Sequence, residues 1–195
     1  MTTMNYCPKC AAPLTTKFDG GRERSACPAD GCGFIHFGEF SIGCAGVVLQ
    51  EDRALLVQRG WQPFAGSWQI PGGYVEHDEP LAEAVEREVL EEAGVTAVVR
   101  DVLAFRHLLG GPGSTNMYVV FRLELVGGDP KCDGDEIKDV GFFTLPEMER
   151  MEAVQGLSKW AIEKALLVPH GRGLLRDHLG PGANRPGWQL FGVPH

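Results

Sequence analysis

The sequence predicts an α/β/α sandwich in which helices cover both faces of a mixed β-sheet. Three observations lead to this fold class: several stretches are apolar or alternate in the manner of strands, two stretches have helical spacing, and 195 residues are enough for one full domain and a small one. The expected strands cover residues 42–49, 54–58, 95–108, 116–126 and 137–143.

The first expected helix covers residues 80–93. Pro80 suits the first helical position, where an N–H would be unpaired anyway, and Gly94 suits the left-handed position just past a helix end. At about 100° per residue, Glu88 and Glu92 fall within about 20° of Leu81 on the apolar side. Two carboxylates are therefore expected to point toward the core. The apolar side itself consists of Leu81, Ala82, Val85, Val89 and Ala93.

These acids predict a metal site. Glu91 lies beside Glu88 and Glu92, and three like charges at spacings of three and four residues weaken a helix. Buried acids also need a partner. A Mg²⁺ or Mn²⁺ ion prefers oxygen ligands and could bridge them to substrate phosphates. The alternative is an ordinary solvated acidic face, which suits Glu83 and Glu86 on the opposite side of the helix.

Residues 73–95 resemble the Nudix box, with the pattern G-x5-E-x7-R-E-U-x-E-E-x-G-U, where U is aliphatic. The resemblance implies a Mg²⁺- or Mn²⁺-dependent hydrolase that cleaves a diphosphate between a nucleoside and another group. It also implies the same α/β/α fold, for a domain over residues 38–168. The matching positions are Gly73, Glu79, Arg87, Glu88, Val89, Glu91, Glu92, Gly94 and Val95.

Carried onto this sequence, the resemblance assigns roles within the box. Glu88 and Glu92 become the principal metal ligands, and Glu91 a further or water-bridged ligand. A backbone carbonyl near Gly72 joins the coordination shell. Arg87 pairs with Glu79 to brace the loop against the helix, although both could be ordinary surface charges.

Four cysteines predict a second metal site near the N-terminus, in the turns Cys7-Pro-Lys-Cys10 and Cys27-Pro-Ala-Asp-Gly-Cys32. Paired turns of this kind are typical of tetrahedral Zn²⁺ held by four thiolates, with hairpins of a zinc ribbon between them. Two disulfides are the alternative. No hydrophobic signal segment precedes the cysteines, which favours a reducing compartment and a structural zinc ribbon over residues 1–37.

The remaining cysteines, Cys44 and Cys132, are expected to be buried structural thiols.

The second expected helix covers residues 157–168. The segment from Pro169 to His195 is rich in Gly and Pro, so we expect an irregular tail. Its apolar residues Trp188, Leu190 and Phe191 are expected to dock on the body or on a second subunit, which leaves a homodimer open.

Outside the box, two features bear on the reaction. Nudix enzymes often carry a further carboxylate in the loop before the last strand, and Glu136 occupies that position. Glu136 could bind a second metal through water or act as the base for the attacking water, with a solvated turn as the alternative. One aromatic residue near the box could stack on an adenine or flavin ring, and the sequence does not indicate which residue does so. The candidates are Trp61, Phe64, Trp68 and Tyr74.

A ribbon followed by the box resembles two groups of Nudix hydrolases: NADH pyrophosphatases, which also remove NAD caps from RNA, and enzymes resembling FAD and ADP-ribose pyrophosphatases. The S-Q-P-W-P-F-P-x-S motif of NADH-specific members is absent from residues 101–112, and Pro112 lies near a proline position of ADP-ribose pyrophosphatases. We therefore expect FAD, ADP-ribose or a related dinucleotide as substrate, with AMP released. The alternatives are an NADH pyrophosphatase, an RNA cap-removing enzyme and a non-catalytic nucleotide-sensing module.

Composition narrows the class of partner. The chain is 44% hydrophobic and 23% charged, has a formal charge of −8, and contains no apolar run of membrane-spanning length. A negative charge disfavours nucleic acid, whose phosphates are held by basic surfaces. We expect a cytoplasmic enzyme whose partner is a small nucleotide-containing substrate.

Overall fold

The computed structural model describes residues 4–109, 114–176, 178 and 191–192. The chain divides into two compact units. The smaller unit is Met1–Phe40 with Leu108–Asn116, and the larger unit is Ser41–His107 with Met117–His195.

The smaller unit contains the hairpin expected between the two cysteine turns. Strands β1 (Thr15–Asp19) and β2 (Arg22–Ala26) pair in antiparallel fashion. The two residues between them, Gly20 and Gly21, have φ values of 56° and 81°. A two-residue turn with positive φ at both positions matches the twist of a hairpin and favours glycine.

The larger unit is built on a six-stranded sheet in the order β5-β4-β3-β7-β6, and β8 also pairs with β4. Strand β4 is antiparallel to β3, β5 and β8, whereas a bridge between Trp68 and Val154 is parallel, so the sheet is mixed. The strands are β3 (Glu39–Gln50), β4 (Arg53–Arg59), β5 (Trp68–Gln69), β6 (Thr96–Leu109), β7 (Ser114–Gly127) and β8 (Ile137–Phe143).

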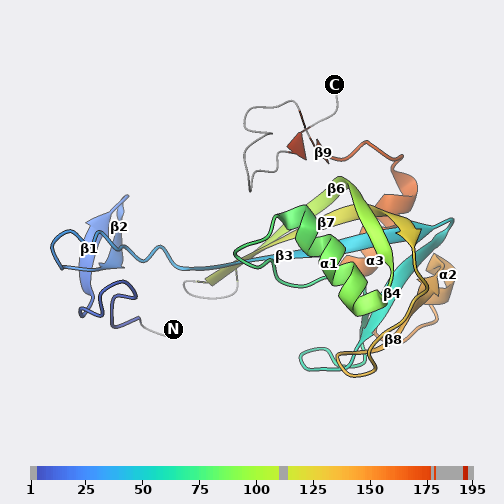
Figure 1. Ribbon diagram of the computed structural model, residues 1–195, viewed down its shortest axis with the longest axis horizontal. Helices are drawn as coiled ribbons and strands as arrows, with labels where there is room; N and C mark the ends of the chain where they lie inside the picture. The colour runs from blue at the N-terminus through green and yellow to red at the C-terminus, as the bar shows by residue number, and fades with distance from the viewer. Residues whose placement is uncertain (1–3, 110–113, 177, 179–190, 193–195) are drawn as a thin grey trace. The chain divides into compact units, whose positions relative to one another are not determined.

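Helices cover both faces of this sheet. Helix α1 (Leu81–Ala93) packs Val85 and Val89 into one core cluster, while α3 (Gly156–Leu167) packs Ala161 and Ile162 into a separate one. Figure 1 shows α1 in front of the sheet and α3 behind it. The predicted α/β/α sandwich is confirmed. None of the described helices is long and apolar enough to cross a membrane.

The shortest elements were not expected from the sequence. Helix α2 (Leu145–Met148) has four residues and begins with a capping box, in which the Thr144 and Glu147 side chains bond to each other's backbone N–H. Strand β5 has only two residues. Both elements are too short to show a repeating pattern of apolar residues, so the sequence does not indicate them.

The expectation of an irregular tail is only partly right. Strand β9 (Leu175–Arg176) pairs with β10 (Phe191–Gly192). The Phe191 ring packs edge-on against Phe121, with ring centroids 5.8 Å apart, so Phe191 docks on the body as expected. The expectations for Trp188, Leu190 and Pro112 concern positions outside the described residues.

A buried ion pair ties the sheet to the segment that follows α3. Asp101 of β6 and Arg122 of β7 are fully buried, with 3.4 Å between Asp101 Oδ1 and Arg122 Nε. Arg122 Nη1 donates to the Val168 carbonyl at 2.9 Å, and the Gly171 N–H donates to Asp101 Oδ2 at 3.0 Å. Two strands and the start of the tail therefore share one polar cluster.

We expect Arg122→Met to lower the free energy of unfolding by about 3–5 kcal/mol, because it leaves the Asp101 carboxylate buried without its cation. Denaturant unfolding measures the change. The matched control is Arg100→Met, which breaks an exposed pair with Glu124 and should cost less than about 1 kcal/mol. Equal, small effects of both substitutions would contradict the prediction.

Candidate functional site

The helix that carries the predicted metal ligands begins and ends where the sequence indicated. Pro80 has φ −70° and ψ 150° and is the N-cap residue, one position before the first helical residue rather than in it. Gly94 is left-handed with φ 70°, and its N–H bonds to the Leu90 carbonyl at 3.0 Å. The helix ends therefore fix which of its side chains face the loop at residues 70–79.

Glu92 is the most buried of the box glutamates, with 8% of its surface exposed. Its Oε2 accepts a hydrogen bond from the Gly72 N–H at 2.8 Å. Burial raises the pKa of Glu92 to about 8; the Gly72 bond and the Arg59 charge oppose this rise, and the Glu88 and Glu136 charges add to it. A carboxylate in this position has a strong need for a cation.

Two glycines let the loop backbone lie close to strand β3 and to Glu88. Gly72 has φ 154°, and a Cβ there would lie 2.2 Å from the Cys44 carbonyl oxygen. A Cβ on Gly73 would lie 2.6 Å from Glu88 Oε1, so the Glu88 carboxylate lies directly against the loop backbone. Desolvation raises the pKa of half-buried Glu88 even though Arg87 bonds to it. The expectation that Glu88 and Glu92 point inward is confirmed.

Arg87 joins the loop to the acids. Its Nε and Nη2 donate to the two oxygens of Glu79 at 2.9 and 2.6 Å, which is the pairing the sequence suggested. Its Nη1 donates to Glu88 at 2.9 Å and to Glu91 at 3.0 Å. These bonds lower the pKa of Glu79 and raise that of Arg87. The guanidinium is thus fully engaged by carboxylates.

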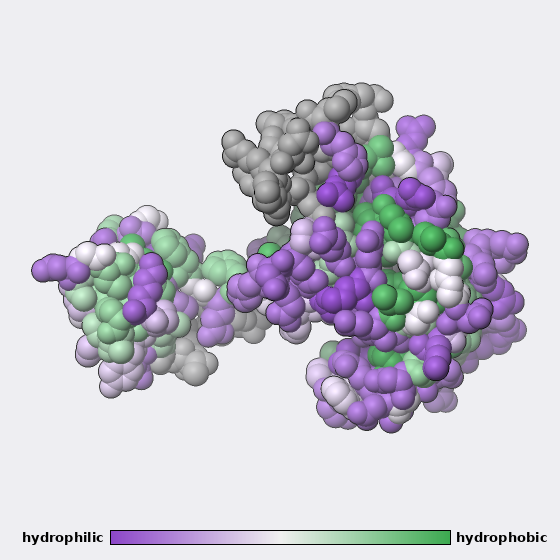
Figure 2. Space-filling view, viewed as in Figure 1, coloured by the Kyte–Doolittle hydropathy of each residue, from purple (hydrophilic) through white to green (hydrophobic). Residues whose placement is uncertain are grey.

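Glu83 and Glu86 were expected on a solvated face. Glu83 is exposed, and hydrophilic residues cover much of the face of the larger unit seen in Figure 2. Glu86 departs from the expectation: it is half-buried, and its Oε1 accepts from the Val99 N–H at 2.8 Å. It attaches α1 to β6, because Val99 belongs to that strand.

Glu136 lies in an exposed position in the loop before β8. Burial is the main cause of the raised pKa of Glu92, and the charge of Glu136 adds to it. The three box glutamates and Glu136 do not form a tight ligand group. Among the described residues, only the four cysteines bring three or more candidate ligand atoms within 4.8 Å of one another. The reason is local: Arg87 holds Glu88 and Glu91, while Glu92 turns to Gly72.

Even so, the donor set has the chemistry of a Mg²⁺ or Mn²⁺ site. All of the candidate ligands are carboxylate or carbonyl oxygens, which these hard cations prefer. Glu92 is buried, and after burial itself the charges of two further acids, Glu88 and Glu136, help to raise its pKa. Glu88, Glu91, Glu92 and the Gly72 backbone could hold such an ion.

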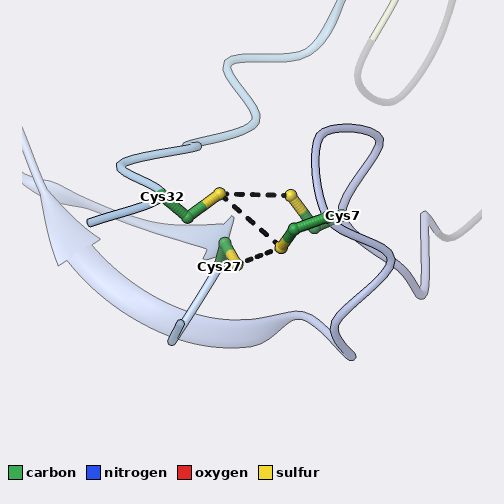
Figure 3. A group of neighbouring side chains, drawn as sticks. Cys7, Cys27 and Cys32 are labelled. Atoms are coloured by element: carbon green, nitrogen blue, oxygen red, sulfur yellow. Dashed lines mark hydrogen bonds between the residues drawn. The ribbon is translucent and has the colours of Figure 1, made fainter. Parts of the chain in front are cut away.

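The four N-terminal cysteines come together. The Sγ atoms of Cys7 and Cys32 are 3.6 Å apart, those of Cys10 and Cys27 are 3.5 Å apart, and those of Cys10 and Cys32 are 3.7 Å apart. All are free thiols, which rules out the disulfide alternative in this structure. Four thiolates at about 2.3 Å from a tetrahedral ion are roughly 3.8 Å apart. Figure 3 shows the sulfurs turned toward one another.

Protonation of the cluster also points to a cation. Desolvation raises the pKa of Cys7, but the backbone N–H groups of Lys9 and Cys10 and the neighbouring sulfurs lower it to about 7. The Ala29 N–H lowers the pKa of Cys27, yet desolvation and the three other sulfurs raise it to about 12. The crowded sulfurs thus disfavour ionisation of Cys27, and a cation bound between them would favour its thiolate form.

Other predicted residues have structural positions. Cys44 is buried, and desolvation raises the pKa of its thiol to about 12, while Cys132 is half-buried. Trp68 is buried and packs edge-on against Phe143 at 5.1 Å, so it belongs to the core. The other three aromatic candidates for stacking, Trp61, Phe64 and Tyr74, are exposed.

Sequence reasoning did not single out Tyr118. A Cβ on Gly43 would lie 2.5 Å from its ring, Arg106 lies over that ring at 5.0 Å, and desolvation, followed by the charges of Cys44 and Glu92, raises its pKa. Tyr118 therefore packs against Gly43 of β3, where the charge of Glu92 acts on it. Its position in the expected strand 116–126 was visible, but its partners come from other strands.

Comparisons with known proteins agree with this geometry. The family model described as NUDIX domain matches residues 40–162. An ADP-ribose pyrophosphatase from Methanocaldococcus jannaschii is 32% identical over 112 residues, which cover 57% of this chain and 66% of that protein. The NAD-capped RNA hydrolase NudC from Stutzerimonas stutzeri is 29% identical over 167 residues, which cover 86% of this chain and 58% of that protein. The chain thus spans about two thirds or less of these curated relatives.

Among solved structures, a NUDIX hydrolase from Nitrosomonas europaea superposes with a TM-score of 0.67 at 25% sequence identity. The superposition covers 82% of this chain and 89% of that one.

Proposed function

Because the chain belongs to the Nudix family, we propose that it is a metal-dependent pyrophosphohydrolase acting on a nucleoside diphosphate linked to a second group. The observation that carries the proposal is the inward position of Glu88 and Glu92 on α1, against a loop that Arg87 ties to Glu79. Burying carboxylates costs folding free energy, and a sensor that only binds nucleotides would not need buried acids.

In the proposed reaction, water attacks one phosphorus of the diphosphate and the bridging P–O bond breaks, so a nucleoside monophosphate and a second phosphate ester leave. Glu88 and Glu92 would be the principal ligands of the metal ion, with Glu91 and the Gly72 carbonyl as further ones. A bound Mg²⁺ or Mn²⁺ would supply charge that offsets the negative charge developing on the phosphate. Glu136 would accept the water's proton or hold a second ion through water.

The N-terminal unit is proposed to be a structural zinc ribbon. Cys7, Cys10, Cys27 and Cys32 would hold one Zn²⁺, with the sulfur spacing and the crowding of thiols as support. In this division the ribbon covers residues 1–37, the hydrolase domain 38–168 and the tail 169–195. All of these thiols are free, which suits the reducing cytoplasm.

FAD, ADP-ribose or a related dinucleotide is the proposed substrate, with AMP as one product. The similarity to an ADP-ribose pyrophosphatase supports it. The second candidate is NADH or an NAD cap on RNA, favoured by the similarity to an NAD-capped RNA hydrolase over 86% of this chain. Whether the enzyme acts as a homodimer is decided by its mass in solution.

We expect dinucleotides to exceed dGTP and ATP by at least about tenfold in kcat/KM, a difference of about 1.4 kcal/mol. A diphosphate between two large groups carries fewer charges than a triphosphate tail and needs fewer cations to bind. Arg87 is engaged by carboxylates and Arg100 by Glu124, so few cations are left for a triphosphate.

The measurement is product chromatography after incubation with FAD, ADP-ribose, NADH, NAD-capped RNA, dGTP and ATP, each with Mg²⁺ and with Mn²⁺. AMP from FAD or ADP-ribose is the expected result. Dominant release of pyrophosphate from a triphosphate would refute the dinucleotide proposal and leave the family assignment in place. No turnover of any compound would favour a sensor.

A further inference from the structure

The backbone that leads into the box is also held by α3, from the face of the sheet opposite α1 (Figure 1). Ser158 is the third residue of α3 and is 3% exposed. Its Oγ accepts a hydrogen bond from the Ile70 N–H at 3.1 Å, and Ile70 is buried as well. Serine side chains often bond to the backbone of neighbouring residues, whereas this bond joins α3 to a segment 88 residues earlier in the chain.

The residues that lead into α3 hold the edge strand β5. The Gln155 N–H donates to the Trp68 carbonyl at 2.8 Å, and the Trp68 N–H donates to the Ala153 carbonyl at 3.0 Å. The Gln155 side chain adds two bonds, because its Nε2 donates to Ser67 Oγ at 3.2 Å and to Gln69 Oε1 at 2.8 Å. Strand β5 is therefore attached to the start of α3 through backbone and side chains.

The stretch from Ile70 to Gly72 connects this attachment to the proposed metal site. After the Ile70 bond to α3, the Pro71 carbonyl accepts from the Gly46 N–H of β3 at 2.9 Å. The Gly72 N–H then donates to Glu92 of α1 at 2.8 Å. These three residues bond in turn to α3, β3 and α1. The Gly72 carbonyl is one of the proposed metal ligands, so its position depends on the Ile70 bond two residues earlier.

Loss of the Ser158 hydroxyl would leave the Ile70 N–H buried without that acceptor, and an unpaired buried N–H favours a shift of the backbone toward another partner. A divalent cation such as Mg²⁺ requires nearly ideal octahedral geometry, so a displaced carbonyl binds it poorly. Groups that hold metal ligands in place affect metal affinity by about 10- to 100-fold in general.

We propose that Ser158 is a positioning residue for the metal site: its hydroxyl fixes the Ile70 N–H and, through it, the Gly72 carbonyl. This inference rests on the proposed function and extends the metal site to a side chain that touches neither the ion nor the substrate. It gives α3, on the opposite face of the sheet from the box helix, a part in metal binding.

The test measures Mn²⁺ binding to the whole chain without substrate, by electron paramagnetic resonance of free Mn²⁺. We expect Ser158→Ala to weaken Mn²⁺ binding by about 10-fold. The Mn²⁺ concentration that gives half-maximal ADP-ribose hydrolysis should rise by the same factor. Saturating Mn²⁺ should restore most of kcat, because Ser158 does not contact the substrate. Ser158→Thr keeps a hydroxyl and should bind Mn²⁺ more tightly than Ser158→Ala does.

The matched control is Ala165→Gly, two turns further along α3, where the side chain is also 3% exposed. Glycine inside a helix destabilises it, so thermal unfolding should report a loss of stability for this variant too. Its Mn²⁺ binding should equal that of the wild type, because the Ile70 bond is intact. If Ser158→Ala does not fold, Ser158→Cys, with a weakly accepting sulfur of similar size, replaces it in the same comparison.

Equal Mn²⁺ binding by the wild type and the Ser158 variant that lacks the hydroxyl would overturn the inference. An equal loss in Ala165→Gly would also overturn it, since the effect would then be one of stability alone. A wild type that binds Mn²⁺ but hydrolyses no dinucleotide would refute the proposed reaction, while the Mn²⁺ comparison would still decide the role of Ser158. A wild type that binds no Mn²⁺ would refute the proposed metal site, and this inference with it.

Discussion

We expect Glu92→Gln to lower kcat by about 100-fold or more, the scale seen when one group that stabilises transition-state charge is lost. The variant keeps the shape of the side chain and an oxygen that can accept from the Gly72 N–H, so the fold should remain. A retained rate above about a tenth of wild type would remove Glu92 from the principal ligands.

The same substitution should stabilise the metal-free protein at high pH. Burial raises the pKa of Glu92 from 4.5 to about 8, so the folded state holds this proton more tightly than the unfolded state does. Ionisation therefore penalises the folded state, and the penalty grows as pH rises from about 4.5 to about 8. Each unit of pKa difference corresponds to about 1.4 kcal/mol, so the gain at pH 8 is of the order of a few kcal/mol.

Thermal unfolding in a chelator at pH 4.5 and pH 8 measures this effect. The wild type and Glu92→Gln should converge at the lower pH and separate at the higher one. Glu83→Gln, on the exposed side of the same helix, is the control and should change neither rate nor pH dependence. If the wild type were the more stable of the two at pH 8, ionised Glu92 would not destabilise the folded protein, and the prediction would be wrong.

We expect Cys7→Ser to lose about one zinc per chain and to unfold the proposed ribbon of residues 1–37. The physical reason is the size of its core: among the described residues from 4 to 40, Cys7 and Ala26 are the only buried hydrophobic ones. So small a core cannot offset the entropy of ordering the chain, whereas a structural zinc contributes about 10–16 kcal/mol to folding.

Elemental analysis and proton NMR of the purified variant test the prediction, and ADP-ribose hydrolysis should survive in part because the box lies in the larger unit. Cys132→Ser, outside the cluster, should keep its zinc. Freshly purified wild type without zinc, or with a Cys7–Cys10 disulfide under reducing conditions, would count against the ribbon.

Local patterns carried most of what could be predicted. Helix 80–93 followed from Pro80, Gly94 and the apolar spacing, and the wheel placed Glu88 and Glu92 inward. The cysteine cluster followed from spacing alone, and the long strands from their apolar runs. In each case a few neighbouring residues contain the whole signal.

Features that depend on distant partners could not be predicted. Glu86 is solvated on a helical wheel, but the Val99 N–H of another element binds it. The Asp101–Arg122 pair requires two strands and the chain after α3 to meet. The catalytic roles of Glu88, Glu91, Glu92, Arg87 and Glu136 remain predictions, because position alone does not establish a reaction.

The buried cluster at Asp101 has a consequence for how the protein behaves at high concentration. Strand β6 ends the main sheet, and an open sheet edge is a template on which other chains can add strands. Leu174 pairs with Val102 through two backbone hydrogen bonds of 3.0 and 3.2 Å, just past the point where Gly171 bonds to Asp101. The segment after α3 thus covers part of that edge, and we expect the polar cluster that anchors it to protect the sheet against aggregation.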